Sequence, residues 1–309
     1  MNEVMQDVRC LWYRRGRPVS GSESLQVLVA YDGSPPANAA IEVAARLFPN
    51  VSASIAYLWT APYANDEVRS RLWKRNGDLD GLVAAIEREG EQDAVRVAAT
   101  GVVLARAAHW DGRPLIRQAH GGEGVYLAQL AKEVSADLLL VGSRGLGGAR
   151  AFLGSVSDMA VHYSPCPVLV IPQPLLTDEY AALASGPVVV GWDASPGATA
   201  ALAAARTLLP GRDLLAVSAG DDVDQPVATL HGGDRPATVL QVPRGHGTTG
   251  RAVAEALAVC AREHQAAAVV VGSRGRSAAA EIILGSVAMA TLHHAHRPVL
   301  VVPSSSRDL

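Results

Sequence analysis

The chain of 309 residues is longer than one ordinary domain, so its length predicts two domains. Hydrophobic residues make up 49% and charged residues 18%, and the net charge of −3 argues against a basic surface for nucleic acid or membrane lipid. No stretch approaches the roughly 20 apolar residues of a membrane span or resembles a signal peptide, and Cys10, Cys166 and Cys260 form no CxxC pair. We expect a soluble cytoplasmic protein without disulfides or a metal site.

The first half of the chain predicts strands that alternate with helices. After an N-terminal arm (1–24), the expected elements are strand 25–31, helix 35–48, strand 51–59, a long helix from about 80 to 108, strand 113–118, helix 123–135, strand 137–142, helix 155–163 and strand 167–171. The strands are apolar throughout rather than alternating, which indicates a parallel sheet covered on both faces. We define residues 25–174 as unit one, an open parallel-sheet α/β domain.

The second half repeats the first after a linker at 175–186. LQVLVAYDGSPP (25–36) and GPVVVGWDASPG (186–197) share a strand that ends in an aromatic residue and Asp, followed by the Ser-Pro pair that typically starts a helix. Unit two (187–304) continues with strands 213–219, 237–242, 268–272 and 298–302 and helices 248–264 and 286–295. An acidic, turn-rich segment (221–236) stands where unit one has its long helix, so unit two is abbreviated.

Each unit ends in a flat apolar strand, VLVI (168–171) in unit one and VLVV (299–302) in unit two. Proteins rarely leave such an edge exposed, so we expect the units to pack as an internal pseudo-dimer through these strands. The alternative is that a neighbouring helix or the N-terminal arm covers the edge.

Glycine segments follow one strand of each unit: GSRGLGGARAFLGSVS (142–157) and GSRGRSAAAEIILGSVA (272–288). Each ends at a predicted helix start, where unpaired N–H groups can bind an anion, and parallel sheets bind ligands at the carboxyl ends of their strands. With Asp32 or Asp193 at the same edge, this combination predicts a nucleotide site. Two plainer interpretations remain: the serines at 155 and 286 are N-caps, and the two aspartates only form capping turns.

With these motifs, residues 25–303 resemble a tandem member of the universal stress protein family, whose ATP-binding pattern is G-x2-G-x9-G-(S/T). Unit two matches this pattern fully, whereas unit one has only eight residues (146–153) before its last glycine. One residue is worth up to about 3.5 Å of reach. The difference is enough to displace a phosphate contact in unit one unless the loop reroutes through Gly147 and Gly148. We expect partial compensation of this kind.

The resemblance implies an adenine-nucleotide alpha-hydrolase-like, Rossmann-like fold and assigns roles to particular residues. The aspartates would contact adenine or ribose, the residues before them and at the end of the second strand would line the base, and the glycines and Gly-Ser-Val would hold the phosphates. The arginines of the GSRG turns either touch a phosphate or point to solvent. The implied residues are Ala30, Tyr31, Asp32, Leu58, Gly142, Arg144, Gly145, Gly154, Ser155 and Val156 in unit one, and Gly191, Trp192, Asp193, Ala219, Gly272, Arg274, Gly275, Gly285, Ser286 and Val287 in unit two.

The sequence lacks a P-loop, a nucleophile elbow and a convincing acid–base pair, so we expect no enzyme activity. The implied function is that of a stress-response regulator that binds ATP, with or without Mg²⁺, or else AMP or ADP. Its nucleotide state would be read by an unknown protein partner, and the chain would be able to form a homodimer. A slow ATPase and a scaffold that binds no nucleotide are the alternatives.

Overall fold

The computed structural model describes residues 24–63, 65–76, 78–143, 153–220, 229–231, 235–246, 248–275 and 284–303. Within these ranges, unit one contains the strands and helices expected from its sequence and one further helix. Its elements are β1 (Gln26–Ala30), α2 (Pro35–Leu47), β2 (Ser52–Trp59), α3 (Asp66–Asn76), α4 (Leu79–Ala107), β3 (Asp111–Gln118), α5 (Glu123–Glu133), β4 (Leu138–Gly142), α6 (Ser155–Tyr163) and β5 (Val168–Ile171).

The predicted linker contains a short helix, α7 (Thr177–Ala182), so it is not simply an irregular connection. Unit two then repeats the plan, with a two-residue strand, β8, that the sequence did not predict. Its elements are β6 (Val188–Gly191), α8 (Pro196–Leu208), β7 (Leu214–Gly220), β8 (Thr229–Leu230), β9 (Ala237–Pro243), α9 (Thr249–Glu263), β10 (Ala268–Gly272), α10 (Ser286–His294) and β11 (Val299–Val302).

The Ser-Pro pairs start helices as the sequence predicts. Ser34 is the N-cap of α2 and its side chain accepts a hydrogen bond from the Ala37 N–H. Ser195 caps α8 in the same way, with the Ala198 N–H as the donor. Because a capped N–H no longer needs water, these serines define where both helices begin.

All of these strands join one sheet in the order β3-β2-β1-β4-β5-β11-β10-β6-β7-β9-β8. Strands within each unit are parallel, apart from β8, which pairs antiparallel with β9. Two buried clusters line the two faces of the sheet. Residues of α2, α4 and α8 contribute to one cluster, and residues of α5, α6, α9 and α10 contribute to the other. The chain is therefore a mixed α/β protein with a mostly parallel sheet covered on both faces.

The two last strands pair with each other, as the sequence predicts. β5 and β11 run antiparallel, with Leu169 opposite Leu300, and all residues of both strands are buried. Pairing satisfies the backbone groups that each apolar edge would otherwise expose. This contact makes the sheet continuous across the two units.

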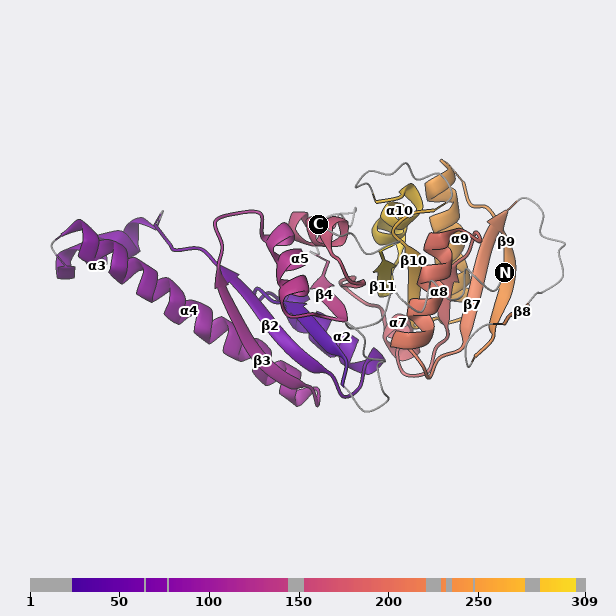
Figure 1. The fold of residues 1–309 in the computed structure, drawn as a ribbon, viewed down its shortest axis with the longest axis horizontal. Helices are drawn as coiled ribbons and strands as arrows, with labels where there is room; N and C mark the ends of the chain where they lie inside the picture. Colours follow the sequence, from indigo (N-terminus) through magenta and orange to yellow (C-terminus); the bar gives the residue numbers. More distant parts are fainter. Residues whose placement is uncertain are drawn as a thin grey trace.

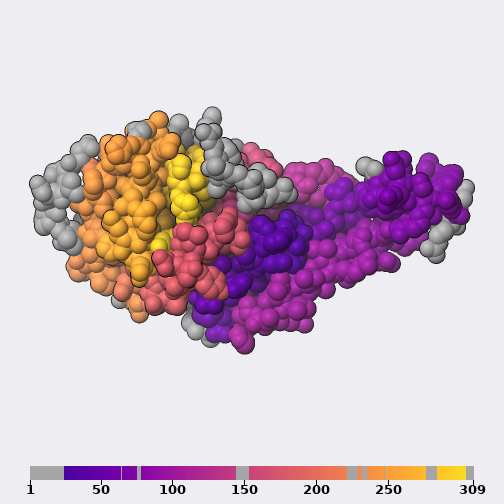
Figure 2. All heavy atoms as spheres, turned by 180° about the vertical axis from the view of Figure 1, so that it is seen from behind, coloured from indigo at the N-terminus to yellow at the C-terminus, as the bar shows by residue number. Residues whose placement is uncertain are grey.

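Helix α3 and the first half of α4 extend beyond the sheet as a helical arm (Figure 1), which forms the purple projection in Figure 2. Helix α3 is not predicted from the sequence, because its charged residues leave no broad apolar stripe. Leu72 of α3 instead packs into a small separate cluster with Leu82 and Ile86 of α4. Between β7 and β9 of unit two, the residues that the structure describes form β8 and no helix. In the described ranges, no helix is both long enough and apolar enough to span a membrane.

Candidate functional site

A pocket of about 370 Å³ lies at the carboxyl ends of the strands of unit one. β1 and β4 are neighbours in the sheet, and the strand order changes direction between them. From β1 the sheet continues to β2 on one side, and from β4 it continues to β5 on the other. The pocket is lined by every predicted residue of unit one that the structure describes; Arg144 and Gly145 lie outside the described residues. These lining residues are Ala30, Tyr31, Asp32, Leu58, Gly142, Gly154, Ser155 and Val156.

Asp32 stands in a tight turn after β1. Its Oδ1 accepts a 2.9 Å hydrogen bond from the Ser34 N–H, and Gly33 between them has a φ of 79°. The capping-turn interpretation is therefore correct for this one oxygen. Asp32 is exposed, and no described residue donates a hydrogen bond to its Oδ2. That oxygen is available to accept a hydrogen bond from a ribose hydroxyl or an amino group.

Tyr31 places its ring against the inner wall of the pocket. The side chain is 3% exposed, and its hydroxyl donates a 2.6 Å hydrogen bond to Asn38 Oδ1. Burial raises the pKa of Tyr31, and the nearby negative charge of Asp32 raises it further. The phenol therefore stays neutral and fixed by α2, which makes it a rigid wall for a ligand.

The first turn of α6 forms the opposite wall. Gly154 is the N-cap of α6 and no side chain caps this helix end; Gly285 has the same role at α10. The interpretation of Ser155 and Ser286 as N-caps is therefore wrong, because both are the first helical residue and both are exposed. An uncapped helix start leaves its N–H groups and its positive dipole end directed at the pocket, which favours an anion.

Ser157 links the two sides of the glycine segment. Its hydroxyl donates a 2.8 Å hydrogen bond to the Gly142 carbonyl oxygen at the end of β4. Gly142 in turn lies close to α2, because a Cβ at this position would be 3.0 Å from the Pro36 carbonyl oxygen. The loop between these ends (144–152) lies outside the described residues. The effect of its being one residue shorter than the loop of unit two therefore stays a prediction.

Several pocket residues were not predicted from the sequence. They are Ser34, Pro36, Ala37, Ala56, Glu123, Leu127, Val141 and Ser157. Glu123 matters most, because it adds a second carboxylate to the pocket that Asp32 lines. The Gly121-Gly122 pair that precedes it signals a turn at the carboxyl end of β3, at the same edge of the sheet as Asp32.

The two units differ at this second carboxylate. Glu123 begins α5, whereas Thr249 begins the corresponding helix α9. The next residue is glycine in both units and allows the helix to pack closely. A Cβ on Gly124 would be 2.4 Å from the Val156 carbonyl oxygen, and one on Gly250 would be 2.7 Å from Ser286 Oγ. The two sites thus differ in charge at the start of this helix.

In unit two, Asp193, Gly275 and Gly285 lie close together. The Gly285 N–H donates a 2.7 Å hydrogen bond to the Ser273 carbonyl oxygen, which brings the two ends of the glycine segment together. A Cβ on Gly275 would lie 3.2 Å from Asp193 Oδ2. Asp193 Oδ1 accepts a 3.0 Å hydrogen bond from the Ser195 N–H, repeating the turn at Asp32.

The remaining unit-two residues lie at the same edge of the sheet. The Arg274 carbonyl oxygen packs on the start of α8, where a Cβ on Gly197 would be only 1.9 Å from it. The Trp192 N–H donates to the Val217 carbonyl oxygen, and Arg244 Nε donates to the Ala219 carbonyl oxygen at 3.4 Å. Gly191 and Gly272 end β6 and β10, which are neighbours in the sheet, and Val287 follows Ser286 in the first turn of α10. In the described ranges, no group of three His, Cys, Asp or Glu residues could hold a metal ion.

Comparison with known proteins finds the same family in both units. The model of the Universal stress protein family matches residues 25–172 and 185–303, one match in each unit. A universal stress protein of Mycobacterium tuberculosis is 29% identical over 314 residues, which cover 90% of this chain and 95% of that protein. A second one from this organism is 36% identical over 191 residues, covering 55% of this chain and 63% of that protein.

The crystal structure of a universal stress protein from Archaeoglobus fulgidus matches with a TM-score of 0.64 at 18% sequence identity. The match covers 92% of this chain and 100% of that one, which shows that the two share their fold. Family matches in both repeats cover most of the chain, so the chain belongs to the universal stress protein family as a member with two domains in tandem.

Proposed function

We propose that each unit binds an adenine nucleotide, ATP or a lower phosphate of adenosine, and that a protein partner responds to the nucleotide-bound state. The observation that carries the proposal is the convergence of Asp32, Gly142 and the first turn of α6 on one pocket. An apolar strand end suits a base, an aspartate suits ribose or an amino group, and a helix start suits phosphates. Membership in the universal stress protein family supports the same function.

The test is titration calorimetry with ATP, AMP and adenosine at up to millimolar ligand, with and without Mg²⁺. Wild-type protein should bind ATP. Ser155→Asp should weaken ATP binding in unit one at least tenfold, which corresponds to about 1.4 kcal/mol, because a carboxylate repels the phosphates. The helix should tolerate this change, since a negative side chain is favourable in its first turn. Ser286→Asp is the corresponding variant of unit two.

Thr177→Asp is the matched control, since it adds the same charge at the first position of α7, a helix that does not line the pocket. Adenosine affinity should change little in all three variants, because adenosine carries no phosphate. If wild-type protein binds neither ATP nor AMP at millimolar concentration, the proposal is wrong and a scaffold without nucleotide is the better description.

A second candidate function, slow hydrolysis of ATP, is favoured by one observation. Glu123 places a carboxylate in the pocket, where it could accept a proton from an attacking water. Release of phosphate over many turnovers by wild-type protein, lost in Glu123→Gln, would assign the protein to this class. We expect no such turnover above background, because the described pocket residues include no cation to stabilise the leaving phosphate.

A further inference from the structure

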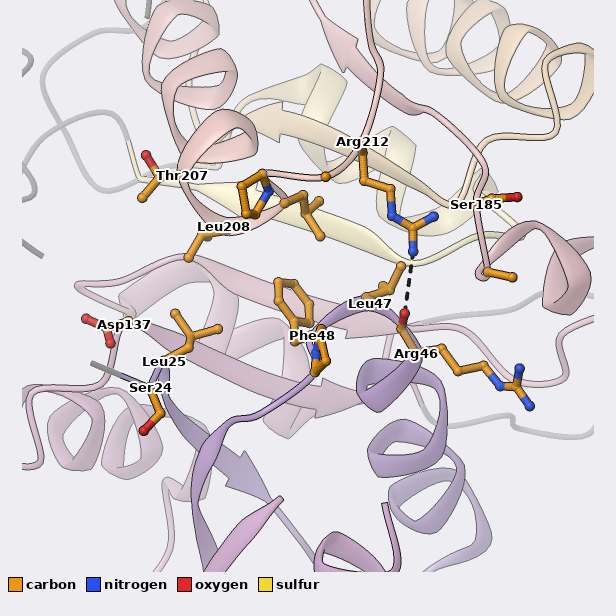
Figure 3. A pocket seen from close by; sticks show the side chains of 15 residues that line it. Ser24, Leu25, Arg46, Leu47, Phe48, Asp137, Ser185, Thr207, Leu208 and Arg212 are labelled. Atoms are coloured by element: carbon orange, nitrogen blue, oxygen red, sulfur yellow. Dashed lines mark hydrogen bonds between the residues drawn. The ribbon is translucent and has the colours of Figure 1, made fainter. Parts of the chain in front are cut away.

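A second and larger cavity, of about 630 Å³, lies between the two units (Figure 3). It is at the opposite edge of the sheet from the proposed nucleotide sites, because its residues precede strands rather than follow them. Leu25 comes just before β1, Asp137 just before β4 and Arg212 shortly before β7. Its volume is in the range of small-molecule sites, which often occur between domains.

The middle of the cavity is apolar. Unit one contributes Leu25 and Phe48, and unit two contributes Leu208 and Leu209. Figure 3 shows Leu25 and Phe48 on one side of the cavity and Leu208 on the other. A hydrocarbon chain between them would remove apolar surface from water on both of its sides, which is favourable.

One end of the cavity carries positive charge. Arg46, in the last turn of α2, and Arg212 of unit two lie there, whereas Asp137 and Ser24 lie toward the other end (Figure 3). The Arg46 guanidinium lies 4.3 Å from the centre of the Tyr180 ring. Arg212 donates only to carbonyl oxygens, those of Gly186, Leu183 and Arg46.

No carboxylate of the described residues forms an ion pair with either arginine. The nearest acidic candidate on α2, Glu42, accepts a hydrogen bond from the Tyr180 hydroxyl instead. The two positive charges at this end of the cavity are therefore not neutralised by an ion pair. A carboxylate is the group that guanidinium donors bind most readily.

We propose that this cavity binds a small amphipathic monoanion, a carboxylate with an alkyl or aryl chain of moderate length. The carboxylate lies at Arg46, and the chain lies between Phe48 and Leu208. Asp137 toward the other end disfavours a second negative group on the ligand. The site is separate from the nucleotide pockets and does not depend on nucleotide binding.

Decanoate is the probe for this site, with decanol and decyltrimethylammonium as ligands of the same chain length without the negative charge. Binding to the full chain is measured by titration calorimetry below the micellar range. Decanoate should bind saturably, and decanol and decyltrimethylammonium should each bind at least fivefold more weakly, because neither makes a charge-assisted bond.

Gly211→Trp tests the position of the ligand. Gly211 lines the cavity, and a Cβ there would have no atom within 4 Å, so the indole has open space to enter. This variant should weaken decanoate binding at least tenfold, whereas Gly211→Ala should leave it unchanged.

Arg46→Gln tests the carboxylate contact and should weaken decanoate binding about fivefold, a modest change because the arginine is exposed. Arg106→Gln, in the last turn of α4 and away from the cavity, is its matched control. Thermal unfolding of each variant verifies that it remains folded. The proposal is wrong if wild-type protein does not bind decanoate, if Gly211→Trp binds it as wild type does, or if decanol binds equally well.

Discussion

The Ser157 hydroxyl donates a 2.8 Å hydrogen bond to the Gly142 carbonyl oxygen, so the start of α6 is tied to the end of β4. The two residues bracket the glycine segment of unit one, and the bond holds its ends together whatever path the loop takes between them. Unit two has Ala288 at the matching position and closes the segment with the bond from the Gly285 N–H to Ser273. The two repeats thus reach the same arrangement through different hydrogen bonds.

We predict that Ser157→Ala lowers the free energy of unfolding by about 1 kcal/mol, because it removes a hydrogen bond at a site that is 7% exposed. It should also weaken ATP binding in unit one, measured in the Ser286→Asp background. Ser164→Ala is the matched control, since its hydroxyl donates a 2.8 Å bond to the Cys166 carbonyl oxygen at the other end of α6. Ser164→Ala should lower the free energy of unfolding, measured by urea denaturation, by a similar amount and should leave the ATP affinity unchanged. Equal effects of both variants on ATP binding would contradict the proposed role of Ser157.

Glu123→Gln should strengthen ATP binding in unit one about threefold to tenfold, because it removes a negative charge from the pocket in which we propose that the phosphates bind, while keeping the side-chain shape. Adenosine binding should be unaffected. Glu91→Gln on the exposed surface of α4 is the control for the change in net charge. Titration calorimetry in the Ser286→Asp background measures the ATP and adenosine affinities of both variants. Weaker ATP binding in Glu123→Gln would mean that Glu123 contributes to binding, through Mg²⁺ or directly.

The turn after the first strand has a left-handed residue in both units: Gly33 with φ 79° and Ala194 with φ 60°. Only glycine adopts this conformation without cost, so Ala194→Gly should stabilise the protein by about 0.5 kcal/mol after the greater chain entropy of glycine is deducted. Gly33→Ala should destabilise it by about 1–2 kcal/mol. The added Cβ would also lie 3.0 Å from Val97. Chemical denaturation should show that the free energy of unfolding rises in Ala194→Gly and falls in Gly33→Ala. A change in the same direction in both variants would contradict the shared turn geometry.

Arg212 connects three segments through carbonyl oxygens, those of Arg46 at the end of α2, Leu183 after α7 and Gly186 before β6. Arg212→Ala should therefore lower the free energy of unfolding by about 2 kcal/mol, since bonds from a charged donor are stronger than neutral ones. Arg106→Ala, which loses a single bond to the Gly112 carbonyl oxygen, should cost clearly less. If urea denaturation shows the same loss of unfolding free energy in both variants, the contacts that Arg212 makes between segments contribute little to stability.

Burial raises the pKa values of the Cys166 and Cys260 thiols from 9.0 to about 11. The folded state therefore binds these protons more tightly than the unfolded state does. The resulting stabilisation is fully present below pH 9 and is lost as the pH rises from 9 toward 11. We predict that stability falls over this range and that iodoacetamide at pH 8 labels neither thiol until guanidinium unfolds the protein. Peptide mapping by mass spectrometry checks the labelling, and rapid labelling of either cysteine in the native state would contradict the prediction.

Much of the candidate site could be predicted from short stretches of sequence. Asp32 follows an apolar strand, Gly142 ends another, and Gly154-Ser155 opens a helix, so each was identifiable from its immediate neighbours. Glu123 was not, because nothing local shows that the end of β3 reaches the same pocket. Helix α3 was missed for a related reason: its stability depends on Leu72 packing against α4, and its own residues form no broad apolar stripe.

The sequence by itself determined the duplication, the order of nearly all strands and helices, and the residue types at the ends of the strands. These follow from hydrophobic pattern, Ser-Pro helix starts and glycine positions, which act over a few residues. Only the tertiary structure decided that β5 and β11 align Leu169 with Leu300, that Ser157 bonds to Gly142, and that a cavity lined by Phe48 and Leu208 lies between the units. Such contacts join residues far apart in the chain, and their geometry depends on how whole helices pack on the sheet.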